Sequence, residues 1–127
     1  MSMSVLVIAI NLLSLLKPVP PKETTVTRKA WIEAVRTALP TAFCKPDAYF
    51  RQCFDVTQET CEDTARSATR TCLADVQKDL PEVFKQPEDG QKWGSKVGAC
   101  VGQAYELAHL SKRVHSEKCD DPSKWAP

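Results

Sequence analysis

The stretch Thr57–Asp79, TQETCEDTARSATRTCLADVQKD, decides the fold of this chain. Threonine is a favourable N-cap, so Thr57 can begin a helix, and small or apolar residues then recur every three or four positions. These residues are Cys61, Ala65, Ala68, Cys72 and Val76. The charged residues between them are Glu59, Glu62, Asp63, Arg66 and Arg70. A period of about 3.6 residues predicts a long amphipathic helix whose small and apolar stripe faces the core.

Cys61 and Cys72 both lie on this stripe, because eleven residues at 100° each return to within about 20° of one direction. Their separation along the helix is about 16 Å, which exceeds the Cα–Cα distance of about 7 Å that a disulfide can bridge. An intact helix therefore prevents them from bonding to each other. Each must bond to a different element, and most of the possible connectivities remain open.

The cysteine content indicates an exported protein. The number is even, and no C-x-x-C or Cys/His cluster with the spacing of metal ligands is present, so disulfides are favoured over thiols that are free or bind metal. The six predicted disulfide cysteines are Cys44, Cys53, Cys61, Cys72, Cys100 and Cys119.

The N-terminal residues 1–22 form a separate region. Val5–Leu16 is an apolar run, shorter than the roughly 20 residues that span a bilayer but suited to the apolar part of a signal peptide. No basic residue precedes the run and no clear cleavage motif follows it, so a weak membrane anchor or an apolar first helix are alternatives. Lys17–Lys22 contains three prolines and predicts an extended spacer.

Residues 23–127 are expected to form one all-α domain of about four helices in a small disulfide-bonded bundle. Besides the helix over 57–79, the pattern predicts a helix over 25–39 that ends at Pro40, and a short one that starts near Pro46. Residues 82–86 are expected to form a turn with Phe84 facing inward. A fourth helix is predicted from 87 to 114, with acidic residues in its first turn, followed by an irregular tail held at Cys119.

Gly94, Gly98 and Gly102 form a stripe on the predicted fourth helix, at a cost in helix propensity of about 1 kcal/mol each relative to alanine. Close approach of a neighbouring helix within the domain would offset this cost. Self-association or partner docking along the glycine groove is the alternative. The groove is therefore a candidate surface for a homo-oligomer.

Aromatic side chains supply two further candidates. Phe43, Tyr49, Phe50 and Phe54 gather around two cysteines, where they form either core or the lining of an apolar pocket. Trp93 and Trp125 are candidates for partner contact, because tryptophan is enriched among the residues that dominate binding energy.

Charge and motifs exclude several functions. The net charge is +1, from 17 basic and 16 acidic residues with interleaved signs, which argues against nucleic-acid binding. His109 and His115 lie about 240° apart on a helix, so they are expected at the surface or near a helix end rather than in one site. No nucleophile motif, phosphate loop or zinc motif is present. We therefore predict no catalytic residue, no metal ligand and no cofactor.

These observations favour a non-catalytic protein of the cell envelope or the secreted space that binds another protein, such as an inhibitor or an immunity protein. A rigid scaffold without convergent chemistry suits binding better than turnover. A carrier of a small apolar, lipid-like molecule is the alternative, and a small secreted hydrolase is a third. Membrane contact is expected only through residues 1–22, if they are retained.

Overall fold

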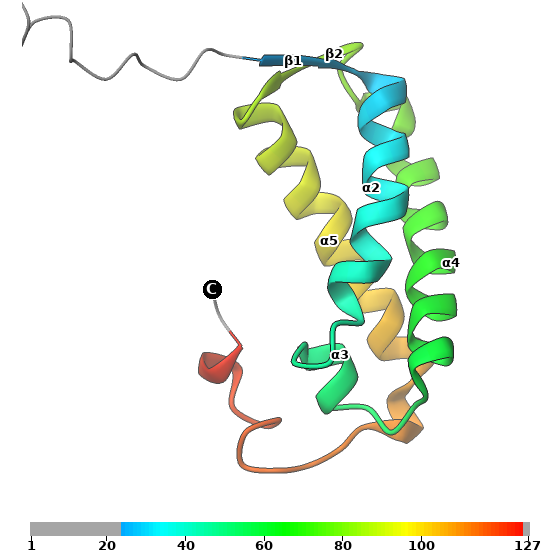
Figure 1. Ribbon diagram of the computed structural model, residues 1–127, viewed down its shortest axis with the longest axis vertical. Coiled ribbons are helices and arrows are strands. Elements are labelled where there is room, and N and C mark those ends of the chain that lie inside the picture. Colours follow the sequence, from blue (N-terminus) through cyan, green and yellow to red (C-terminus); the bar gives the residue numbers. More distant parts are fainter. Residues whose placement is uncertain (1–23, 126–127) are drawn as a thin grey trace, which may run out of the picture.

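Three long helices packed side by side make up most of residues 24–125, the part that the computed structural model describes (Figure 1). They are α2 (Arg28–Phe43), α4 (Gln58–Val76) and α5 (Glu88–Ala108), and α4 packs against both others. A two-stranded sheet closes the upper end of Figure 1, while the short helix α3 (Tyr49–Gln52) and the C-terminal tail form the lower end. The predicted all-α, disulfide-bonded fold is confirmed. The predicted domain boundary stays a prediction, since residues 1–22 lie outside the described residues.

Helix α4 agrees closely with its prediction. The Thr57 hydroxyl oxygen accepts a hydrogen bond from the Thr60 amide at 3.1 Å, which confirms the N-cap. The predicted stripe is buried from Cys61 to Cys72 and half-buried at Val76. The last residues of the predicted helix form a 3₁₀ turn (Gln77–Asp79) rather than α-helix.

Helix α2 begins and ends later than predicted. It starts at Arg28, because Thr27 caps it by accepting a hydrogen bond from the Ala30 amide at 3.1 Å. The predicted end at Pro40 is wrong, since the helix continues through Pro40 to Phe43. Proline removes one amide donor from the helix. The helical hydrogen bonding nevertheless continues beyond it, because the Pro40 carbonyl accepts from the Cys44 amide at 3.2 Å.

The sheet was not predicted. Strands β1 (Thr24–Thr27) and β2 (Val83–Gln86) pair antiparallel, with Val26 opposite Phe84, so the expected turn over 82–86 is wrong. The partner strand lies far away in the sequence, and a local pattern does not reveal such pairing. The inward position of Phe84 is confirmed, because alternation along the strand buries this side chain completely.

Helix α5 ends at Ala108, so the predicted continuation to residue 114 is wrong. A 3₁₀ turn, η2 (Leu110–Lys112), follows, and Arg113 then forms an antiparallel bridge with Phe54. Backbone hydrogen bonds on both sides of this bridge pair the segment with the region around Cys53, which replaces the bonds that further helix would make. The two acidic residues in the first turn of α5 are confirmed.

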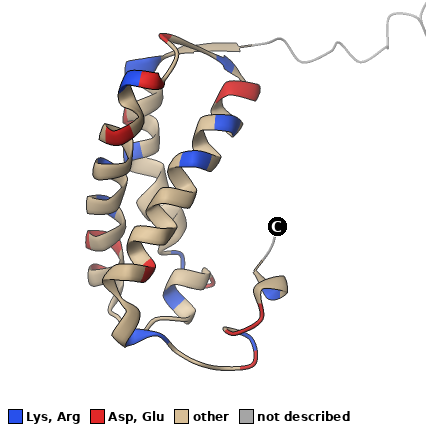
Figure 2. Cartoon of the chain, turned by 180° about the vertical axis from the view of Figure 1, so that it is seen from behind, with Lys and Arg blue, Asp and Glu red and all other residues tan. Residues whose placement is uncertain are grey.

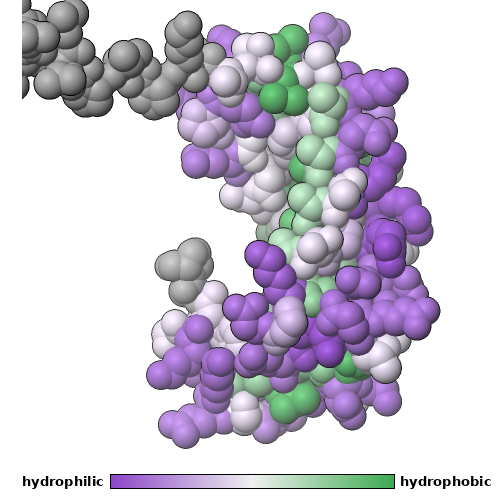
Figure 3. Space-filling model, viewed as in Figure 1, coloured by the Kyte–Doolittle hydropathy of each residue, from purple (hydrophilic) through white to green (hydrophobic). Residues whose placement is uncertain are grey.

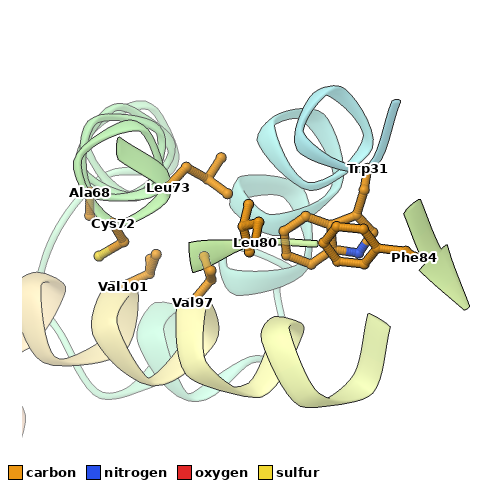
Figure 4. Close-up of a cluster of buried hydrophobic side chains, with 8 residues drawn as sticks. All are labelled: Trp31, Ala68, Cys72, Leu73, Leu80, Phe84, Val97 and Val101. Carbon is orange, nitrogen blue, oxygen red and sulfur yellow. The ribbon is translucent and has the colours of Figure 1, made fainter. Parts of the chain in front are cut away.

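The upper half of the bundle contains a core contributed by all three long helices and β2 (Figure 4). We call this group the upper core: Trp31, Ala68, Cys72, Leu73, Leu80, Phe84, Val97 and Val101. Trp31 and Phe84 stack with their ring centroids 4.5 Å apart. This packing fixes the direction of the sheet and of the chain entering α2.

A second group of buried residues, the lower core, lies beneath: Cys44, Cys53, Phe54, Cys61, Ala65, Tyr105 and Cys119. All six cysteines form disulfides, which join Cys44 to Cys61, Cys53 to Cys119, and Cys72 to Cys100. Cys61 and Cys72 therefore bond to different elements, as their helical spacing requires.

Hydrophilic side chains cover the lower end and the right flank of the face seen in Figure 3, and a paler strip runs lengthwise beside that flank. Within residues 24–125, none of the helices combines the length and apolar character needed to cross a membrane.

Candidate functional site

A hollow at the lower end gathers aromatic and charged side chains from three parts of the chain. We call it the Arg113 hollow, and its lining is Tyr49, Glu106, Arg113, Cys119, Asp120, Pro122 and Trp125. Tyr49 begins α3 and Glu106 lies in the last turn of α5. The tail supplies the remaining residues, and the Cys53–Cys119 disulfide holds it against the lower core.

Arg113 lines the hollow and lies beside two aromatic rings. Its guanidinium carbon is 5.4 Å from the centroid of Tyr49 and 5.7 Å from that of Phe54, within the range of cation–π attraction. One terminal nitrogen, Nη2, donates to the carbonyl oxygen of Cys119 at 3.0 Å. These contacts fix the plane of the guanidinium group.

The ion pairs of Arg113 are long. Nη1 lies 3.8 Å from Glu106, and Nη2 lies 4.0 Å from Asp120, which are ion-pair distances and too long for hydrogen bonds. Nε is buried and has no hydrogen-bond partner among the described residues. Arg113 therefore keeps donor capacity that its neighbours within the described chain do not use.

Tyr49 donates a hydrogen bond from its hydroxyl to Oε1 of Glu106 at 2.8 Å. Burial raises its pKa to about 12, with the hydrogen bond to Glu106 and the negative charge of that group acting in the same direction and Arg113 opposing them. Tyr49 is thus a neutral donor at physiological pH. Its ring forms one wall of the hollow.

Trp125 forms the outer wall. Its ring meets that of Tyr49 edge to face, with the centroids 5.5 Å apart, and its Nε1 donates to the Lys118 carbonyl at 3.0 Å. The Lys118 ammonium group lies 4.6 Å from the centroid of the Trp125 ring. These contacts orient an aromatic side chain that would otherwise be free to rotate.

The chemistry of the Arg113 hollow suits recognition. It offers flat aromatic walls, a guanidinium group and carboxylates, which together can hold a polar or aromatic side chain of a partner. Over residues 24–125, no three His, Cys, Asp or Glu side chains gather as they would around a metal ion.

A second, more polar hollow lies between α2 and α4 and includes Arg36, Arg66 and Arg70. Arg36 lies 3.8 Å from Glu33, and Arg66 lies 2.9 Å from Asp63, each acid being on the same helix. Exposed pairs of this kind contribute little to stability, and they reduce the positive charge of this hollow.

The residues predicted for partner contact separate into three places. Trp125 lines the Arg113 hollow, whereas Trp93 is half-buried in the first half of α5, with the Lys96 ammonium group 4.7 Å from its ring centroid. A Cβ atom added at Gly94 or Gly98 would meet nothing within 4 Å, while one added at Gly102 would meet Phe50 at 3.3 Å. Internal packing therefore accounts for Gly102 alone.

Both histidines lie where the pattern placed them. His109 is the C-cap residue of α5, and its Nε2 lies 2.8 Å from the Thr64 hydroxyl oxygen, within hydrogen-bond distance. His115 is exposed, with Nδ1 3.2 Å from Asp120. They do not converge on one site.

The sequence did not single out Glu106, Arg113 or Asp120. The aromatic group that includes Tyr49 was recognised, but its charged neighbours come from positions more than 50 residues further along the chain. Among the contacts that bring them together are the Phe54–Arg113 bridge, the Cys53–Cys119 disulfide and the Tyr49–Glu106 hydrogen bond. An arginine directly after a helix end gives no local indication of such a site.

A family model described as "T2SS substrate NttA", that is, a substrate of a type II secretion system, matches residues 25–113. No match was found among curated proteins or among solved structures. The three disulfides are typical of a protein that works outside the reducing cytosol. The match spans more than half of the chain. The chain therefore belongs to this family and is a secreted protein.

Proposed function

We propose that this secreted protein acts without catalysis by binding another protein, and that the Arg113 hollow is its contact surface. One observation carries the proposal: Tyr49, Arg113 and Trp125 line a single hollow. Tyrosine, arginine and tryptophan are the residue types most enriched among those that dominate binding energy. An inhibitor that blocks its target through this surface is the specific form that we favour.

The rigidity of the lower end supports this proposal. The Cys53–Cys119 disulfide, the hydrogen bond from Arg113 to the Cys119 carbonyl and the hydrogen bond from Trp125 to the Lys118 carbonyl hold the tail in one arrangement. Side chains that are ordered before binding lose less conformational entropy when the partner arrives. A surface of this kind can bind tightly with a modest contact area.

The long ion pairs of Arg113 suggest what a partner would contribute. A carboxylate or carbonyl oxygen of the partner would give the guanidinium group the short hydrogen bond that Glu106 and Asp120, at 3.8 and 4.0 Å, do not provide. The aromatic walls would cover the apolar part of the same side chain.

The proposal is tested by affinity capture with the full secreted chain as bait, followed by measurement of the dissociation constant for the captured partner. Trp125→Ala and Arg113→Ala should each weaken binding by about 30-fold or more, as expected for residues that dominate binding energy. Val83→Ala, at an exposed apolar residue outside the hollow, and Arg66→Ala, at another arginine with an acidic neighbour, serve as controls.

Circular dichroism must show that each variant retains its helices. Trp125→Ala is the more secure test, because Arg113 also holds the tail. Equal affinity of the Trp125→Ala variant and the wild-type protein would exclude the Arg113 hollow as the contact surface. The non-catalytic role would be contradicted if the wild-type protein turned over a substrate and either variant abolished that activity.

A further inference from the structure

The exposed face of α4 and α5 carries a second feature, distinct from the Arg113 hollow. A shallow hollow runs between the two helices, lined mainly by small side chains: Asp63, Thr64, Ser67, Ala68, Thr71, Ala104 and Ala108. Leu107 follows Ala104 by one helical turn, so it lies on the same side of α5, and it is 65% exposed. We call this surface the α4–α5 face.

The α4–α5 face contains both features that contact with a second copy would need. It presents a large apolar side chain, Leu107, beside a hollow whose small side chains allow another helix to approach closely. A twofold symmetric contact requires that one patch contain both the projecting group and the recess that receives it. Leu107 of each copy can then fill the hollow of the other.

The upper part of the α4–α5 face carries one acidic and one basic side chain, Asp75 and Lys96, which could pair with those of a second copy. The Cys72–Cys100 disulfide sets α4 and α5 at one level, with their Cα atoms 5.9 Å apart. Asp75 lies three residues beyond Cys72, about 4.5 Å up the axis of α4, and Lys96 lies four residues before Cys100, about 6 Å up the antiparallel α5. Both residues are exposed, and helical spacing places both on the side of this face.

Figure 2 shows this side of the molecule, with basic bands on the upper half of α5 and mostly uncharged ribbon below them. Asp75 forms no ion pair within residues 24–125, and Lys96 lies over the Trp93 ring. A twofold axis parallel to the helices would place α4 of each copy over α5 of the other. Asp75 of each copy would then face Lys96 of the other copy at the same level, so that the contact would contain this pair twice.

We propose that two copies of this chain associate through their α4–α5 faces, as an antiparallel arrangement of four helices about this axis. The glycine stripe is not the contact, because Gly94 and Gly98 lie on a different side of α5 from Leu107. The dimer would present two Arg113 hollows, so a partner with two binding sites would be held more tightly than by a single copy.

The first test is the mass of the full secreted chain by light scattering and sedimentation, at concentrations up to about 1 mM. We expect twice the mass of one chain. Leu107→Glu should return the mass to that of one chain, whereas the matched control Val83→Glu, at an apolar side chain that is 51% exposed on the sheet, should leave the dimer intact. A single-chain mass at every concentration, or a dimer that Leu107→Glu does not affect, would overturn the proposal.

The second test is a charge exchange. Asp75→Lys and Lys96→Asp should each weaken the dimer by about tenfold or more, because each creates two like-charge contacts. The double variant should recover the wild-type dissociation constant, because it restores both pairs with their signs reversed. A double variant no tighter than the single variants would reject the arrangement about the parallel axis.

Discussion

The upper and lower ends of this molecule are built in different ways. The upper core is formed by regular helices and a strand, with the Trp31–Phe84 stack among aliphatic side chains. The lower core consists of Phe54, Tyr105, one alanine and the sulfurs of two disulfides, with Tyr49 and Phe50 packed against it. Much of the chain around it is irregular. The Arg113 hollow therefore lies at the end of the molecule where disulfide bonds, rather than continuous packing of helices, determine the structure.

Removing a disulfide from each end should show this difference most strongly. Replacing Cys53 and Cys119 with serine should lower the free energy of unfolding by about 2–4 kcal/mol, as measured by denaturant titration. The tail should also become selectively open to proteolysis and hydrogen exchange, because η3 (Pro122–Lys124) is its only regular element after η2 within the described residues.

The matched variant replaces Cys72, a member of the upper core, and Cys100, which packs against it; this disulfide joins α4 and α5. Its free energy of unfolding should fall by a comparable amount, about 2–4 kcal/mol. Hydrogen exchange should then increase throughout α4 and α5 and not selectively in the tail. If both variants loosen the same residues, the two ends are not separate structural units.

Alkaline pH should weaken the lower end by a smaller amount. Folding raises the pKa of Tyr49 to about 12 from its ordinary value of 10.0, chiefly through burial, and burial also raises the pKa of Tyr105. Because the neutral phenol is the form favoured by folding, its contribution to stability is complete below pH 10 and is lost as the pH rises from 10 toward 12.

Denaturant titration across this pH range, together with tyrosinate absorbance, measures the effect. Tyr49→Phe should reduce the fall in the free energy of unfolding and leave the part that belongs to Tyr105. A Tyr49 that ionises near pH 10 in the folded protein would show that its ring is not held in the Arg113 hollow as described.

Glycine replacements should give the smallest effects, with opposite outcomes along α5. Gly98→Ala should raise the free energy of unfolding by about 0.5–1 kcal/mol, since its Cβ meets nothing within 4 Å and alanine favours helix. Gly102→Ala should gain less or lose stability, because its Cβ would lie 3.3 Å from the Phe50 ring. Thermal unfolding of both variants provides the comparison, and a destabilised Gly98→Ala variant would contradict the open position of this residue.

The sequence pattern correctly predicted those features that depend on residues close together in the chain. The capped, striped helix α4, the inward Phe84 and the acidic start of α5 were all confirmed. Two of the errors fall where distant residues decide the structure. The sheet needs a partner strand, and the end of α5 is set by the pairing of Arg113 with Phe54. Part of the candidate site was accessible in the same way, since Tyr49, Cys119 and Trp125 were singled out and Glu106, Arg113 and Asp120 were not.

The sequence by itself determined that Cys61 and Cys72 face the core and cannot bond to each other, because helical periodicity and rise depend only on their spacing. It also indicated export, through the number and spacing of the cysteines. Only the tertiary structure decided which cysteines pair and which charged side chains surround Tyr49. The physical reason is that disulfides and ion pairs form between residues close in space, and their separation in the sequence does not fix that distance.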